Sequence, residues 1–223
     1  PRESSPSRYL LPMPLPAILP CWAVTAPGAE PLTAVELRAL GIEPGEREPG
    51  GVAFEATAAQ LADALLGLRT AVRVTVRLGS FTAKSFAELE RHGKTIDWAS
   101  VIPPGMAVHF RVTSKKSKLY HEDGIAERLE RSLFAAVSGL TTVRAPSTAE
   151  ALEDDVTKVP PVLRIVVRVH RDVVTVSADA AGGLLHRRGW RQAVAKAPMR
   201  ETLAATLLLA SGGTRAEPLL DPM

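Results

Sequence analysis

The sequence predicts an α+β fold of two layers, in which helices pack on one mixed or antiparallel sheet. Short runs of alternating apolar residues recur along the chain, and segments with helical periodicity separate them. Apolar residues make up 46% of the chain and charged residues 23%, which is the composition of a globular protein that can bury a core.

Residues 1–20 are predicted to form a flexible or extended leader. Prolines interrupt their apolar residues repeatedly, so the segment lacks the continuous apolar stretch of a signal peptide or a membrane span. Residues 21–25 then favour a short strand, and residues 31–40 favour a helix that Gly41 ends. The single cysteine, Cys21, indicates a reducing compartment, and we expect a cytoplasmic protein.

Two capping boxes mark the next helices. Thr57-Ala58-Ala59-Gln60 begins one after a strand at residues 52–54, and Ser85-Phe86-Ala87-Glu88 begins another, which Gly93 ends. Between them, residues 72–78 alternate valine and leucine with arginine and threonine, which predicts a half-buried strand.

The second half of the chain repeats this alternation. Residues 108–112 favour a strand, and residues 125–137 follow as an amphipathic helix. Residues 163–169 and 174–178 predict a hairpin whose turn is His170-Arg171-Asp172. Residues 181–197 are rich in glycine and arginine, have no clear period and are predicted to be a linker.

A last helix follows this linker. Pro198 suits its first position, Glu201 its first turn and Gly212 its end. Its apolar face needs a partner that the remaining residues do not supply, and this face consists of Met199, Leu203, Leu207 and Ala210.

Positive charge gathers in two segments without acidic residues, although the net charge is only +3. Such clusters bind phosphate backbones by releasing counterions, and neighbouring aromatic rings can stack on unpaired bases. The structural alternative is a solvated basic loop in each case, with Trp190 and the run around it docking the linker onto a neighbouring domain. The two clusters together favour RNA, and the candidate contacts are Arg111, Lys115, Lys116, Lys118, Tyr120, Arg187, Arg188 and Arg191.

No catalytic constellation is found in the sequence. The five histidines are far apart and have no metal-ligand spacing. His170-Arg171-Asp172 matches part of a kinase catalytic loop, but no glycine-rich phosphate loop precedes it. On these residues alone, the chain is predicted to be a binding module.

Three stretches resemble the class I RNA methyltransferases that contain a THUMP domain. They are "WAVTAPGAEPLTAVELRALG", "SKKSKLYHEDGIAERLERSL" and the junction "AGGLLHRRGWRQAVAKAPMRETLAATLLLASG...PLLDPM", the last being the most specific. The chain is most similar to the bacterial large-subunit rRNA guanine-N2 enzymes. Compared with their usual pattern, Ala181 replaces serine, and Trp190 replaces tyrosine or phenylalanine.

The resemblance implies a ferredoxin-like N-terminal portion at residues 21–100, a THUMP core at 101–180, the linker at 181–197, and the first helix and strand of a truncated Rossmann-like methyltransferase domain at 198–223. It implies S-adenosylmethionine as the cofactor of the complete enzyme. Asp221 matches one residue of the cofactor motif, while the family's glycine turn and Asn-Pro-Pro-Tyr motif are not in this sequence. The fragment is therefore expected to bind RNA, rRNA rather than tRNA, and not to bind cofactor or catalyse methylation by itself.

Three functions stay open on these observations. The chain is the RNA-recognition part of a methyltransferase whose catalytic domain is missing here, or a stand-alone RNA-binding adapter. The third is a protein-interaction module that self-associates through the exposed last helix.

Overall fold

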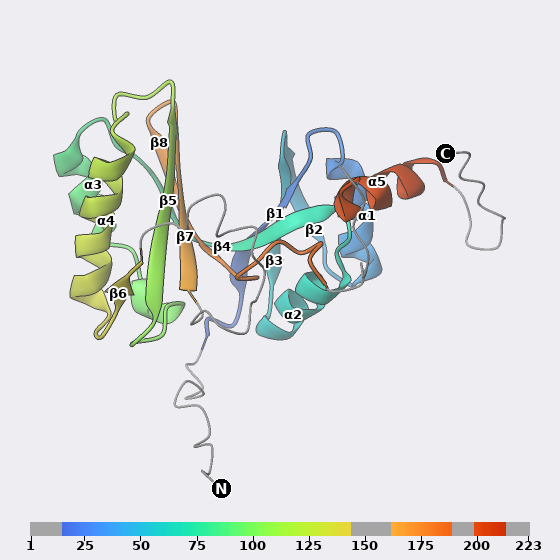
Figure 1. Cartoon of the computed structure of the whole chain (residues 1–223), viewed down its shortest axis with the longest axis horizontal. Coiled ribbons are helices and arrows are strands. Elements are labelled where there is room, and N and C mark those ends of the chain that lie inside the picture. The colour runs from blue at the N-terminus through green and yellow to red at the C-terminus, as the bar shows by residue number, and fades with distance from the viewer. Residues whose placement is uncertain (1–14, 144–161, 189–198, 213–223) are drawn as a thin grey trace, which may run out of the picture.

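A computed structural model describes residues 15–143, 162–188 and 199–212. Eight described strands form one sheet in the order β2-β3-β1-β4-β8-β7-β5-β6 (Figure 1). The elements are β1 (Leu19–Thr25), α1 (Glu30–Ala39), β2 (Pro44–Glu48), β3 (Gly51–Ala56), α2 (Ala58–Gly67), β4 (Ala71–Thr82), α3 (Phe86–Gly93), a 3-10 turn η1 (Trp98–Ser100), β5 (Ala107–Lys115), α4 (Glu122–Ala136), β6 (Thr141–Thr142), β7 (Val162–His170), β8 (Val173–Asp179) and α5 (Glu201–Ala210).

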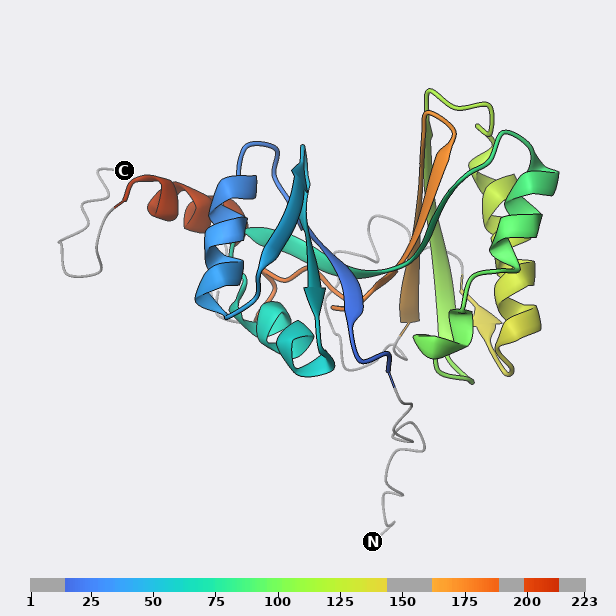
Figure 2. The ribbon, with the colours of Figure 1, turned by 180° about the vertical axis from the view of Figure 1, so that it is seen from behind.

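The long strand β4 joins two halves of the sheet. Its first part pairs antiparallel with β1, and the part from Thr75 onward pairs antiparallel with β8. The pairing shifts between Arg77 and Gly79, an irregularity of the kind that bends and twists a strand. Figure 2 shows β4 crossing from one half of the molecule to the other.

Each half has its own hydrophobic core. The first contains Leu37 of α1 and Val74 of β4, and the second contains Leu129 of α4 and Val176 of β8. Val101 packs against both cores. Because Val76 and Ala178 are register partners and each faces a core, both helix pairs pack on the same face of the sheet.

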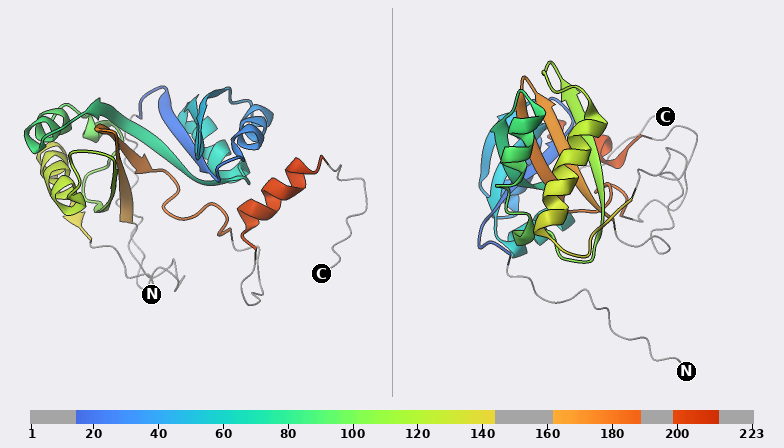
Figure 3. Two further views of the ribbon diagram at one scale, coloured as in Figure 1. Left: turned by 90° about the horizontal axis from the view of Figure 1, so that it is seen from above. Right: turned by 90° about the vertical axis from the view of Figure 1, so that its left-hand side faces the viewer.

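The sheet bends along β4, so its two ends point in different directions. Helices α3 and α4 lie at one end of the molecule, and α1 and α2 lie at the other (Figures 1 and 3). The faces that carry no described helix therefore turn toward one another.

The structure confirms the capping box at Thr57, the cap at Ser85 and the hairpin turn after β7, all of which were predicted from short sequence motifs. Thr57 and Gln60 make both hydrogen bonds of a capping box at the start of α2. At Ser85 the hydroxyl accepts from the Glu88 N–H as predicted, but the Glu88 carboxylate accepts from the N–H of Lys84. The hairpin between β7 and β8 turns through Arg171 and Asp172, both with positive φ.

Some boundaries differ from the sequence-based ones. Strand β1 begins at Leu19, inside the expected leader, and Leu19 is buried in the first core. Pro20 is tolerated there because pairing with β4 begins only at Cys21, so Pro20 has a neighbouring strand on one side alone. Strand β2 was not predicted, because its charged sequence lacks an apolar face.

The segment expected to complete the N-terminal portion also packs elsewhere. Leu89, Trp98 and their neighbours in residues 83–102 belong to the second core. The cores thus divide within β4, well before residue 100. Because β4 alternates apolar and polar residues along most of its length and contributes side chains to both cores, its sequence does not show where one core ends and the other begins.

Part of the predicted linker returns to the first half. The N–H of Ala180 donates to Val74 and that of Leu185 donates to Val72, and the Leu185 side chain enters the first core. Helix α5 forms as predicted and lies near α1 (Figure 1). Its leucines at 203, 207 and 208 remain about half exposed (Leu203 47%, Leu207 52% and Leu208 50%), and so does Met199 just before the helix (49%). In the described part of the chain, every helix is too short or too polar to cross a membrane.

Candidate nucleic-acid interface

The predicted lysines lie at the end of β5 and in the loop that follows it, and we call these three residues the basic loop (Lys115, Lys116 and Lys118). The hairpin tip between β7 and β8 holds this loop by two hydrogen bonds. The backbone N–H of Arg171 donates to the carbonyl oxygen of Lys115, and the Asp172 carboxylate accepts from the backbone N–H of Lys118 at 2.7 Å. Lys116 has a φ of 53°, a tight turn that exposes this residue and its two lysine neighbours. The loop is therefore a defined basic surface.

Tyr120 follows the basic loop and is 69% exposed. Its ring centroid lies 4.2 Å from that of His121, and Leu119 beside it is buried. The ring is thus held next to the lysines and still accessible, as the stacking prediction requires.

Arg188, another of the predicted RNA contacts, makes hydrogen bonds within the chain. Its guanidinium donates to three carbonyl oxygens at the end of α2, those of Leu65, Leu66 and Leu68, and its Nε donates to Leu185. Because these bonds satisfy carbonyls at a helix C-terminus, where positive charge is favoured, Arg188 anchors the linker to the first half. These bonds are those expected of the structural alternative, in which this part of the linker docks onto a neighbouring domain.

The two predicted clusters are not brought together by the fold. The basic loop belongs to the second half. Arg187 is exposed and follows the linker segment that packs on the first half. Arg191, Trp190 and Asp221 lie outside the described residues.

A larger basic surface lies on the face of the sheet that no described helix covers. The six arginines and lysines of β4, β5, β7 and β8 all occupy this face, because alternate residues of a strand point to the same side. We call five of them the arginine face: Arg73, Arg77, Arg111, Arg164 and Arg168. The sixth, Lys115, belongs to the basic loop and continues the row.

Strand register places these side chains close together. His109 of β5 pairs with Arg164 of β7, and Lys115 pairs with His170. Arg168 pairs with Thr113, two residues before Lys115. The basic side chains of β5 and those of β7 therefore form two neighbouring rows on the same face. On β4, Arg77 pairs with Ser177 of β8, which extends the face toward the first half. Asp179 is the one acidic residue in these four strands.

The pKa shifts reflect this crowding of positive charge. Burial, and then the neighbouring Arg73, lower the pKa of the Arg164 guanidinium, while Asp179 acts in the opposite direction. Burial lowers the pKa of His109, and the charges of Arg164 and Arg111 lower it further. A positive potential that disfavours an added proton is one that favours a phosphate anion.

Arg77 extends the face across the joint between the halves. Its guanidinium lies 5.3 Å from the centroid of the Trp22 ring, and its Nε is a buried donor with no hydrogen-bond partner among the described residues. Trp22 is half-buried on β1, on the same face, opposite Thr75.

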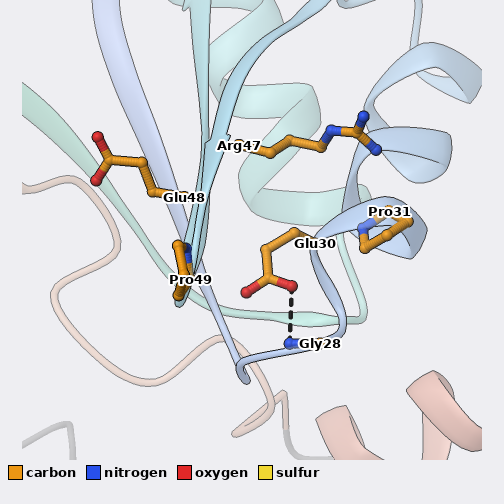
Figure 4. A pocket seen from close by; sticks show the side chains of 6 residues that line it. All are labelled: Gly28, Glu30, Pro31, Arg47, Glu48 and Pro49. Atoms are coloured by element: carbon orange, nitrogen blue, oxygen red, sulfur yellow. Dashed lines mark hydrogen bonds between the residues drawn. The ribbon is translucent and has the colours of Figure 1, made fainter.

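Two small hollows lie in the described structure. One of about 300 Å³ lies between α1 and β2, where the Glu30 carboxylate accepts from Gly28 N–H (Figure 4). Another of about 200 Å³ lies between β5 and α4 and includes Arg111 and His109 in its wall. No group of three or more His, Cys, Asp or Glu residues that could hold a metal ion occurs in the described segments.

Sequence reasoning missed most of the arginine face. Arg73, Arg77, Arg164 and Arg168 are separated by apolar residues in their strands, so they form no charge run. The alternation of arginine with valine predicts that the arginines of one strand share a face, but it does not show that the arginines of several strands share the same face.

Comparison with known proteins gives matches at both ends of the chain. Residues 21–75 match the RlmL ferredoxin-like domain, and residues 188–223 match the RMKL-like methyltransferase domain. The ribosomal RNA large subunit methyltransferase K/L of Vibrio campbellii is 32% identical over 202 residues, covering 90% of this chain. The chain belongs to the RlmL/RMKL-like methyltransferase family. The match at residues 21–75 ends within β4, near the point where the two cores divide.

Two solved structures share the fold of this member of the RlmL/RMKL-like family. One, provisionally described as an N6-adenine-specific DNA methylase of Listeria monocytogenes, is 30% identical with a TM-score of 0.72 over 86% of this chain. The other, provisionally named a methyltransferase and solved with SAH, is 28% identical with a TM-score of 0.73 over 92% of this chain. The chain spans 27% of the Vibrio protein and about half of each solved one, 48% and 52%.

Proposed function

We propose that this chain is the RNA-binding part of a methyltransferase of the RlmL/RMKL-like family, and that it holds rRNA across the arginine face and the basic loop. The observation that carries the proposal is the strand register, which gathers cations from β4, β5 and β7 on one uncovered face. Phosphate contacts of this kind position an RNA and carry little sequence information themselves.

In the complete enzyme, S-adenosylmethionine supplies the methyl group, and the acceptor is the exocyclic amine of a guanine in large-subunit rRNA. The Vibrio relative supports rRNA as the substrate, and the solved relative with SAH supports the cofactor. Asp221, which matches one residue of the cofactor motif, lies outside the described residues. What these residues do is bind and orient the RNA, so the reaction itself is assigned to the rest of the enzyme.

The test is a binding titration across salt concentration with a labelled fragment of large-subunit rRNA and a DNA duplex of equal length. Arg111→Ala with Arg168→Ala should flatten the slope of log affinity against log salt by about 0.7 to 0.9 for each phosphate that is no longer neutralised. Replacing Lys115, Lys116 and Lys118 by Ala should have a similar effect per phosphate.

The matched control removes two exposed cations from the helices, Arg38 of α1 and Arg91 of α3. This variant has the same net charge as the Arg111 and Arg168 double variant and should keep the slope of the parent chain. Equal slopes for both double variants would overturn the assignment of the arginine face. Tighter binding to the DNA duplex would overturn the choice of RNA.

A further inference from the structure

Asp179 is an acid in the middle of a surface that should bind a polyanion. It ends β8 opposite Thr75 of β4, and its side chain is completely buried. A lone carboxylate here reduces the attraction for phosphate, so its position needs a reason.

The carboxylate of Asp179 contacts two members of the arginine face that come from different strands. One oxygen, Oδ2, accepts a hydrogen bond from Arg73 Nη1 and lies 4.0 Å from Arg164 Nη1. The other, Oδ1, accepts from the N–H of Ala181 at 3.1 Å. The backbone after β8 thus fixes the carboxylate, and the carboxylate contacts both guanidinium groups.

Charge balance leaves this cluster positive. One carboxylate stands against Arg73 and Arg164, and Arg111 adds to the same local field. Both paired arginines are mostly but not fully buried, with side chains 18% and 29% exposed. Each therefore keeps donors near the surface while one edge is held in place.

We propose that Asp179 is a positioning residue for RNA binding, which holds Arg73 and Arg164 in a fixed arrangement ready for one phosphate group of the RNA backbone. The proposal rests on the proposed function. Ordering a long side chain costs binding free energy, and a group that has already ordered it in the free protein removes that cost. On this basis the acid strengthens the binding of a polyanion.

The proposal makes a prediction opposite to that of simple electrostatics. Asp179→Asn raises the net charge by one unit, and Coulomb attraction alone would then tighten RNA binding. If Asp179 positions the arginines, the variant should bind the rRNA fragment about five- to tenfold more weakly, since both released side chains must then be ordered on binding. Unchanged or tighter binding by folded Asp179→Asn overturns the proposal.

The control variant is Asp123→Asn, which removes an exposed acid near Arg111 on the wall of the smaller hollow. It should bind RNA equally or slightly more tightly, because the arginines that Asp179 holds, Arg73 and Arg164, keep their carboxylate partner in this variant. Thermal unfolding of each variant, read by circular dichroism, shows whether the protein tested is folded.

A second measurement needs neither RNA nor a substitution. Relaxation of the arginine Nε–H groups by NMR should show Arg73 and Arg164 more rigid than the exposed Arg168 in the free chain. Equal mobility of all three overturns the proposal even if Asp179→Asn does not fold. If the parent chain fails to bind RNA, the proposed function fails, whereas rigid Arg73 and Arg164 would still show that Asp179 orders them.

Discussion

At the scale of single residues, buried carboxylates tie distant turns of the first half together. The Glu30 carboxylate accepts from the N–H groups of Gly28 and Gly50, each at 2.7 Å, and so joins the turn before α1 to the turn between β2 and β3. Glu36 accepts from the backbone N–H groups of Arg69 and Thr70 and from the Thr70 hydroxyl. These acids satisfy backbone donors in partly buried turns and, at Thr70, in a buried one.

Glu30→Gln should lower the melting temperature near neutral pH. The N–H of Gly50, more than any other group, lowers the pKa of Glu30 below its usual 4.5, so the folded state favours the ionised form. This stabilisation is fully present above pH 4.5, the usual pKa of a glutamate, and it is lost as the pH falls through the lower pKa that Glu30 has in the folded state. Thermal melts should therefore show a gap between the parent chain and the variant that narrows in acid, while Glu46→Gln on exposed β2 should leave the melt unchanged.

His109 should titrate below its usual 6.5, because it is half-buried and close to Arg164 and Arg111. Because folding lowers its pKa, the folded state favours the neutral imidazole. The contribution of His109 to stability is therefore fully present above pH 6.5 and is lost as the pH falls through its lower folded pKa. Arg111→Ala should raise the pKa of His109, measured from the imidazole signals in an NMR titration. A midpoint that stays the same or moves lower in this variant would contradict the clustering of charge on the arginine face.

At the scale of elements, Arg188 shows how the linker is fixed to the first half. Its guanidinium spans three carbonyls at the end of α2, a geometry that suits a planar group with five donors in a fixed fork better than a compact ammonium. Together with buried Leu185, it determines where the chain leaves the first half on its way to α5.

Arg188→Ala should destabilise the fold by about 1.5–3 kcal/mol, the range for hydrogen bonds to a charged group. Arg188→Lys should recover only a small part of this stability. Chemical denaturation measures both, and Arg91→Ala on α3 serves as the control for removing one exposed positive charge. Full stability of Arg188→Ala would show that these bonds contribute nothing.

At the scale of the whole molecule, one sheet carries two cores and one basic face. The bend along β4 directs both helix pairs outward and turns the uncovered faces toward each other (Figure 3). Helix α5 lies at the far end of the molecule from the basic loop, next to α1 (Figure 1). The proposed RNA surface and the exposed apolar side chains of α5 thus lie on different parts of the molecule.

The chain alone should self-associate through α5, because Leu203 and Leu207 are about half exposed. Replacing both by Ser should make sedimentation independent of protein concentration, while Leu66→Ser, an exposed leucine on α2, should not. Amide exchange across residues 199–212 should be fast in the monomer. Strong protection there, or a parent chain that is monomeric at all concentrations, would contradict this prediction.

The sequence by itself determined the described helices, most of the described strands and the presence of basic clusters. Capping residues at Thr57 and the turn at Arg171 act within a few residues, so their hydrogen bonds follow from the local order of side chains. Exposed lysines of the basic loop could be recognised for the same reason, because they are neighbours in the chain.

The tertiary structure decided which charges act together. Arg73 and Arg164 meet only because β4, β8 and β7 are neighbours in the sheet, and Asp179 joins them only in that register. The hydrogen bonds of Arg188 to carbonyls at the end of α2 likewise depend on residues 120 to 123 positions away in the chain. Strand order and register are set by packing between residues far apart in the chain, and alternation along one strand gives its faces without identifying its neighbours.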